Sequence, residues 1–270
     1  MALTEEPAGA QAEGEEDSRD QVGEGEPEAG LMTLGEHLSE LRRRLIICIL
    51  AVAASGVVAW FFYDQILHFM VAPYVSYYHH HHNKSISSGQ LITNGPLEGL
   101  TTRLKISTYI GLAAACPVWV WELWRFITPG LHKNEKKYAV PFVISAVALF
   151  ALGVTTAILV FPKAIGWLVS VSGSSVSPLF SASAYFNMYV VMCLAFGVVF
   201  LYPIVMMFLI LAGVVPTTRW RRWRRFAIVV IAAVAAVITP SSDPFSFVAM
   251  GIPMYIFYEA CIVIGRILKK

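Results

Sequence analysis

The stretch WVWELWRFITPGLHKNEKK, residues 119–137, begins as an apolar, aromatic-rich helix and reaches a helix-ending pair, Pro129 and Gly130. It continues into a short loop that holds three lysines and a single acid, Glu135. An apolar helix that runs into a tight basic loop is typical of the cytoplasmic face of a membrane protein. The single acid in that basic loop indicates a site for a cationic ligand.

The composition of the whole chain agrees with a membrane protein. The 270 residues are 57% hydrophobic and 14% charged, and their mean hydropathy is +0.63. Several runs reach the roughly 20 apolar residues that are needed to cross a hydrocarbon core of about 30 Å. We therefore predict an all-α, polytopic membrane protein. The four cysteines lie inside apolar runs, and their spacing indicates neither a disulfide framework nor a zinc site.

The N-terminal residues differ from the rest of the chain. Residues 1–30 hold ten of the 18 acids and one base, Arg19, with almost no large apolar side chains. Such a segment cannot bury enough surface to offset the entropy lost on ordering. We predict a disordered acidic tail over residues 1–30, followed by one membrane domain over residues 31–270.

The apolar runs predict six transmembrane helices. Pro162 is expected to close the third span, and Pro203 to kink the fourth. The fifth is roughly 21 Å long at 1.5 Å per residue, so the fifth and sixth spans are expected to form a short pair. The long connection over residues 64–105 is expected to hold short helices of its own. The expected spans cover about residues 45–63, 106–128, 138–161, 185–213, 226–239 and 244–264.

The basic residues predict the orientation of these spans. With six spans, 15 of the 20 lysines and arginines lie on one side of the membrane. An excess of bases marks the cytoplasmic side, so both termini are expected to be cytoplasmic. The segment TTRWRRWRR, residues 217–225, could indicate nucleic-acid binding, but at the end of a span it is better explained as an anchor to lipid headgroups.

Few acids lie outside the tail, and neighbouring residues could account for several of these carboxylates. Glu40 can pair with Arg44 four residues later on one helix, and Glu122 with Arg125 three residues later. Asp243 before Pro244 is expected to be a helix N-cap. Glu259 either snorkels to the cytoplasmic surface or faces a cavity or a partner.

Glu40 and Glu135 share the expected cytoplasmic face, each among bases. Two carboxylates on one surface could be neutralised by their neighbours, or could accept an incoming pair of guanidinium groups. These residues alone leave the two explanations open.

The sequence contains no signature of an enzyme. A phosphate-binding glycine loop, an HExxH helix motif and a Ser/His/Asp grouping are all missing from it. The tract His79–His82 could bind a metal, but on an external loop without acidic neighbours we interpret it as incidental. We expect no catalysis, no cofactor and no metal site.

Several segments together resemble the TatC family, the core of twin-arginine protein translocation. The resemblance covers about residues 33–268 and implies a glove-like, concave bundle of six helices. The segments that carry it are HLSELRRRL (37–45), NGPLEGL (94–100), PVWVWELWRFITPGLHKNEKKY (117–138), AFGVVF (195–200) and TPSSDPFSFVAMGIPMYIFYE (239–259).

This resemblance implies a receptor in the bacterial plasma membrane for folded proteins that carry an Arg-Arg signal peptide. It implies transport driven by the proton-motive force, single-span TatA- and TatB-type partner subunits, and a homo-oligomer within the complex. Acids matching Glu40 and Glu135 contact the arginine pair in the family. Arg42 and a turn formed by Phe126, Pro129 and Gly130 lie nearby.

The resemblance also implies structural or partner-contact roles for six further residues. This chain departs from the family pattern at three positions. Glu is usual in the fourth span of the family where this chain has Leu201, Gln is usual at Glu122, and a small residue is common at Arg125. The six residues are Pro96, Glu98, Leu201, Pro203, Asp243 and Glu259.

Two other functions are compatible with the residues. Glu259, Glu122 and Pro203 could belong to a secondary transporter of a small solute, although such folds often carry internal repeats and none is evident here. A membrane scaffold would tolerate the loss of any single acid.

Overall fold

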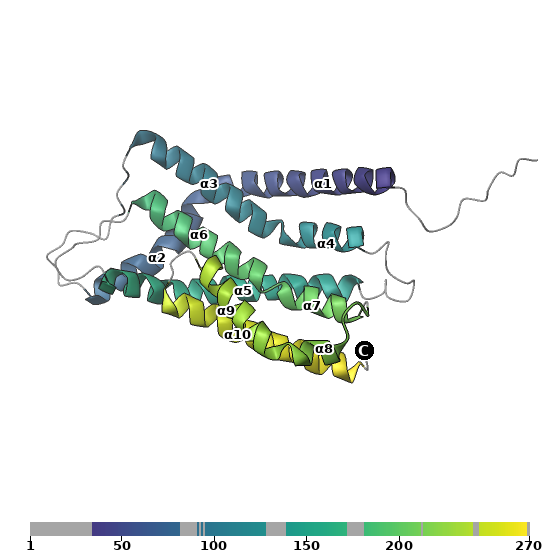
Figure 1. The fold of residues 1–270 in the computed structure, drawn as a ribbon. Helices are drawn as coiled ribbons and strands as arrows, with labels where there is room; N and C mark the ends of the chain where they lie inside the picture. The colour runs from purple at the N-terminus through teal and green to yellow at the C-terminus, as the bar shows by residue number, and fades with distance from the viewer. Residues whose placement is uncertain are drawn as a thin grey trace, which may run out of the picture. The chain divides into compact units, whose positions relative to one another are not determined.

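The computed structural model describes residues 34–81, 91, 93, 95–127, 139–171, 181–211, 213–239 and 243–268. These residues form ten α-helices (Figure 1), which confirms the all-α prediction. The helices are α1 (Leu34–Phe61), α2 (Tyr63–His81), α3 (Pro96–Ala114), α4 (Cys116–Ile127), α5 (Ala139–Val171), α6 (Ala182–Val199), α7 (Tyr202–Leu211), α8 (Thr217–Arg222), α9 (Arg224–Ile238) and α10 (Pro244–Ile267).

The chain divides into two units, residues 1–39 and residues 40–270. In the first unit the structure describes only residues 34–39, the first turns of α1. The predicted acidic tail, residues 1–30, lies outside the described residues. All of the packing below belongs to the second unit.

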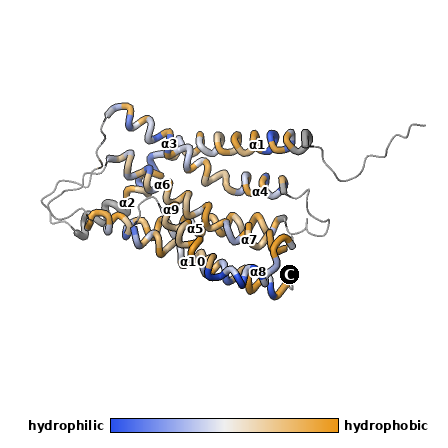
Figure 2. The backbone as a smooth tube through the Cα atoms, in the orientation of Figure 1, coloured by the Kyte–Doolittle hydropathy of each residue, from blue (hydrophilic) through white to orange (hydrophobic). Residues whose placement is uncertain are grey.

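Four stretches of the described chain are long and apolar enough to cross a membrane. Helices α3 and α4 pass the same test together but are bent by 52° at their junction, so the number rises to five if they form one span. Figure 2 shows long hydrophobic tracts along these helices and a hydrophilic segment at α8. The four stretches are residues 38–61, 140–171, 182–211 and 244–267.

One predicted helix end and one predicted helix length are wrong. Helix α5 continues through Pro162 to Val171, because the hydrogen bond that a proline removes is a small loss in a helix held by its neighbours. Phe161, beside this proline, is only 1% exposed and packs on α6. The predicted sixth span corresponds to α10, which has 24 residues and is therefore not short. The predicted fifth span corresponds to α9, which is short, with 15 residues.

The predicted second and fourth spans are each interrupted in the described chain. The second starts at Pro96, earlier than predicted, and breaks at Ala115, just before Pro117, which has no N–H for the helical ladder. The fourth is interrupted between Val199 and Tyr202. This interruption lies just before Pro203, where the sequence predicts a kink.

The apolar core lies where α5, α6 and α10 meet. The Phe161 ring packs edge-on against the Tyr189 ring at 4.5 Å and against the Tyr185 ring at 5.4 Å. The buried Tyr185 hydroxyl donates to the Met70 carbonyl of α2 at 2.9 Å. A Cβ added at Gly153 of α5 would lie 2.5 Å from a carbonyl oxygen of α6. Such close backbone contact is how small residues hold membrane helices together.

Candidate functional site

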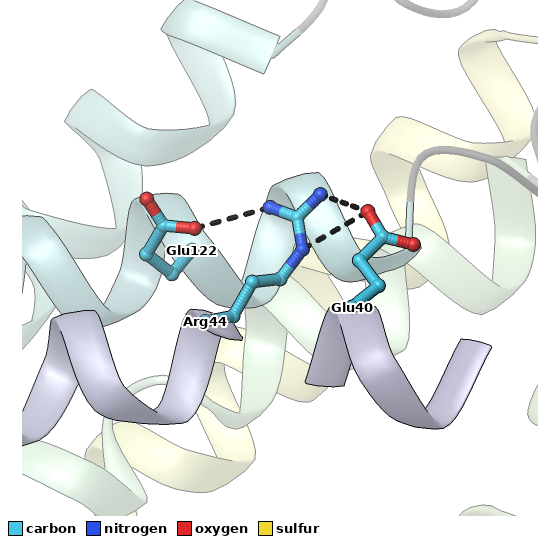
Figure 3. A network of polar contacts seen from close by, with 3 residues as sticks. All are labelled: Glu40, Arg44 and Glu122. Carbon is cyan, nitrogen blue, oxygen red and sulfur yellow. Dashed lines mark hydrogen bonds and ion pairs between the residues drawn. The ribbon is translucent and has the colours of Figure 1, made fainter. Parts of the chain in front are cut away.

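One arginine joins two glutamates on two helices of the described chain (Figure 3). Arg44 donates from Nε to Glu40 Oε1 at 3.1 Å, and its Nη2 pairs with the same oxygen. Its Nη1 donates to Glu122 Oε2 at 3.1 Å. The side chains of Glu40, Arg44 and Glu122 are 22%, 14% and 10% exposed. We call these three side chains the Arg44 cluster.

The local sequence explains one of the two contacts in this cluster, the pair between Glu40 and Arg44. Glu40 and Arg44 are four residues apart on α1, so they lie on one face of the helix. The other contact, between Arg44 and Glu122, depends on how α1 packs on α3. A Cβ added at Gly111 of α3 would lie 2.6 Å from the Gly56 nitrogen of α1. The Ser55 hydroxyl of α1 donates to the Gly111 carbonyl at 2.9 Å.

The bend after α3 completes the cluster. Helix α4 follows the 52° change of direction and approaches α1 at Arg44. Glu122, near the middle of α4, thereby meets Arg44 rather than Arg125 on its own helix. The predicted local pair between Glu122 and Arg125 is therefore wrong, whereas the predicted pair between Glu40 and Arg44 is confirmed.

The charges of the Arg44 cluster do not balance. Two carboxylates and one guanidinium give the three side chains a net charge of minus one at neutral pH. Charges removed from water are costly unless they are paired. The forked guanidinium satisfies both acids at once because its N–H groups point in several fixed directions. The site can therefore hold a guanidinium group.

The other residues expected at this site are only partly described. Arg42 is exposed on α1, one helical turn or less from the cluster. Phe126 is half-buried in the last turn of α4. Pro129, Gly130 and Glu135 lie outside the described residues.

A second arginine–glutamate contact joins α9 and α10. Arg224 Nη2 donates to Glu259 Oε2 at 2.5 Å, and the Tyr255 hydroxyl donates to Glu259 Oε1 at 3.2 Å. The Arg224 and Glu259 side chains are 43% and 28% exposed. Glu259 thus faces a base from the arginine-rich segment, a partner that its position in the sequence does not predict.

Two expected contact residues lie near the start of α3. Pro96 is the first residue of this helix, and Glu98 lies in its first turn. The Ser181 hydroxyl, just before α6, donates to Glu98 Oε1 at 2.8 Å. Glu98 also lines a pocket of about 420 Å³ between α2, α3 and α6.

Three further expected contact residues lie in or beside apolar packing. Asp243 is fully buried and caps α10, accepting from the Ser246 backbone N–H at 2.7 Å, which confirms the predicted N-cap. The Pro203 carbonyl accepts from the Cys261 thiol at 3.6 Å. Leu201 is half-buried and packs on an apolar cluster of α4 and α5 that includes Cys116 and Phe150.

The family model for "Sec-independent protein translocase protein (TatC)" matches residues 36–253. This chain belongs to the TatC family. The TatC match includes the whole Arg44 cluster, whereas Glu259 lies just beyond the matched range. The tract His79–His82 lies within the matched range, but its side chains are outside those that the structure describes.

Individual TatC proteins are similar over most of this chain. The TatC of Frankia casuarinae is 38% identical over 241 residues, which cover 87% of this chain and 65% of that protein. The TatC of Deinococcus radiodurans is 32% identical, with 90% of this chain and 89% of the relative covered. This chain therefore spans slightly less than two thirds of the Frankia protein and most of the Deinococcus protein.

Solved TatC structures share the fold. A crystal structure described as "Twin Arginine Translocase Receptor- TatC" aligns with a TM-score of 0.71 and 32% identity, covering 87% of this chain and all of that one. A second structure of that receptor, in the detergent DDM, gives a TM-score of 0.70 and 33% identity. The comparisons favour a membrane protein of a translocase family over the solute-transporter hypothesis.

Proposed function

We propose that this chain is the receptor subunit of a twin-arginine translocase, and that it binds the Arg-Arg signal peptides of folded proteins at a site that includes Glu40. One observation carries the proposal: the partly buried Glu40 carboxylate already accepts a guanidinium group. A side chain that holds a resident arginine has the surroundings to hold an incoming one.

The chemistry of the guanidinium group accounts for a preference for arginine. Its planar fork matches the two oxygens of a carboxylate, whereas a lysine ammonium is a compact, strongly hydrated point charge. In this proposal Glu40 accepts one arginine of the peptide and Glu135 the other. Arg42 and the turn containing Phe126, Pro129 and Gly130 flank the peptide.

We propose six spans in a glove-like, concave bundle: α1, α3 with α4, α5, α6 with α7, α9, and α10. Both termini then face the cytoplasm of a bacterium, across its plasma membrane. The hydrophilic α8 supports this orientation, since basic segments stay on the cytoplasmic side and bind lipid headgroups. A disordered acidic tail, residues 1–30, would precede this domain.

The proposed partners are TatA- and TatB-type single-span subunits and further copies of this chain. Transport would draw on the proton-motive force, without catalysis or a cofactor in this chain. Contact and structural roles are proposed for Pro96, Glu98, Leu201, Pro203, Asp243 and Glu259. Their positions at helix starts, helix breaks and polar contacts support such roles.

Peptide binding tests the function. The purified full chain would be titrated with a fluorescent signal peptide in Arg-Arg and Lys-Lys forms, using wild type, Glu40→Gln and Glu135→Gln. We expect wild type to prefer the Arg-Arg form and both variants to lose most of that preference. Equal binding of the two peptides by wild type, or unchanged binding by both variants, would contradict the proposed function.

A further inference from the structure

Arg44 occupies the carboxylate to which the proposed function assigns a peptide arginine. Two of its guanidinium nitrogens contact Glu40 Oε1, and the third donates to Glu122 Oε2. An incoming guanidinium group that forks onto both oxygens of Glu40 must therefore displace the two contacts that Arg44 makes with Oε1. The resident arginine is a competitor built into the site.

Glu122 provides a place for the displaced group. It lies on a different helix from Glu40, so Arg44 can keep its contact with α4 while it gives up its contacts within α1. Arg44 is 14% exposed, and Glu122 is 10% exposed. Without this second carboxylate, the displaced guanidinium would be left partly buried and unpaired, which is a costly state.

We propose that Arg44 is an internal placeholder for the signal-peptide arginine, and that Glu122 holds Arg44 when the peptide takes Glu40. This inference rests on the proposed function and assigns a regulatory contact to its site. In the empty receptor the placeholder keeps Glu40 paired. In the complex each guanidinium group has its own carboxylate, so the charges balance within the site.

The placeholder has a measurable consequence for affinity. Part of the binding free energy of the peptide is used to release Arg44 from Glu40. Removing the placeholder should strengthen binding, and removing Glu122 should weaken it by confining Arg44 to Glu40. The effect of Glu122 should vanish once Arg44 is gone, because Glu122 acts through Arg44 and does not touch the peptide.

A double-mutant cycle on the full chain tests this, with the Arg-Arg signal peptide as the probe. We expect Arg44→Gln to bind about tenfold more tightly than wild type, about 1.4 kcal/mol. Glu122→Gln should bind roughly threefold to tenfold more weakly. The double variant should match Arg44→Gln within about twofold.

Arg43→Gln is the matched control, because it removes the same charge from the exposed neighbour of Arg44 on α1. It should change affinity by no more than about threefold, the effect of an exposed charge. If Arg44→Gln does not insert, Arg44→Lys replaces it. A lysine cannot contact both acids in the same way, so this variant should also bind the peptide more tightly than wild type.

Two results would overturn the placeholder. One is an Arg44→Gln or Arg44→Lys affinity that is no higher than that of Arg43→Gln. The other is an equal weakening by Glu122→Gln in the wild-type and Arg44→Gln backgrounds, which would make Glu122 a direct peptide contact. Failure of the proposed function is separate, since it would appear as a wild-type receptor that does not distinguish Arg-Arg from Lys-Lys peptides.

Discussion

The Arg44 cluster and the Arg224–Glu259 pair use the same chemistry in two different ways. Each joins two helices through a guanidinium group and a carboxylate. The Arg44 cluster has two acids for one arginine, and its guanidinium side chain is 14% exposed. The Arg224–Glu259 pair is neutral, and its arginine side chain is 43% exposed.

We propose that this difference separates a binding site from a structural contact. The Arg224–Glu259 pair has no excess charge to offer, and a tyrosine hydroxyl supplies the further hydrogen bond of Glu259. The Arg44 cluster carries an excess negative charge in a less exposed position, where charges interact more strongly. We expect changes to the first region to alter peptide binding, and changes to the second to alter stability by a small amount.

Charge reversal should have the largest effect. Glu40→Arg would place two guanidinium groups together on α1 and remove the carboxylate proposed to accept the peptide. We expect Arg-Arg peptide affinity to fall roughly a hundredfold, measured by titration of the full chain. Arg224→Glu also creates a like-charge pair, and it should leave this affinity unchanged. Equal losses in the two variants would erase the distinction between the regions.

Helix spacing offers a second way to break the Arg44 cluster without touching its charges. In Gly111→Ala the added Cβ would lie 2.6 Å from the Gly56 nitrogen, so α1 and α3 must separate. We expect a loss of about 1–3 kcal/mol in stability, as for other overpacked contacts, together with a weaker preference for arginine over lysine peptides. Thermal unfolding in detergent and peptide titration measure the two effects. Gly99→Ala, whose Cβ would meet no atom within 4 Å, is the control.

The N-cap of α10 tests what stabilises the helix that carries Glu259. Asp243→Ala removes the side-chain acceptor of the Ser246 N–H, and should lower the free energy of unfolding by about 1–2 kcal/mol. Asp243→Asn should retain most of the stability, because asparagine caps a helix about as well as aspartate. Equal unfolding midpoints for the alanine variant and wild type would show that the cap contributes little.

The smallest effect is expected from Arg224→Gln. This variant breaks a contact between partly exposed side chains, and such pairs contribute about 0.2–1 kcal/mol. The unfolding midpoint should fall slightly, and Arg-Arg peptide affinity should not change. A large loss of peptide affinity here would place the second region in the binding site.

Local chemistry explains which features could be predicted from the sequence. The Glu40–Arg44 pair and the Asp243 cap each depend on residues three or four positions apart, so spacing alone identifies them. The short α9 and the apolar spans follow from the length of uninterrupted hydrophobic runs. These features need no knowledge of how the helices pack.

The features that were missed depend on packing between distant segments. Glu122 reaches Arg44, 78 positions away, only because α1 approaches α3 at Gly111 and the chain bends at Ala115. Glu259 meets Arg224, 35 positions away, because α9 packs on α10. Pro162 was expected to end a helix by a local rule, but the packing around Phe161 holds the helix together.

Photo-crosslinking tests the central claim most directly. A photoreactive residue would replace Leu41, beside Glu40, or Ile264 on α10; these side chains have matched exposures of 43% and 44%. The account predicts that position 41 crosslinks an Arg-Arg signal peptide and loses the crosslink with a Lys-Lys peptide, whereas position 264 shows no such dependence. Equal labelling of both peptides at position 41, or an arginine-dependent crosslink only at position 264, would contradict it.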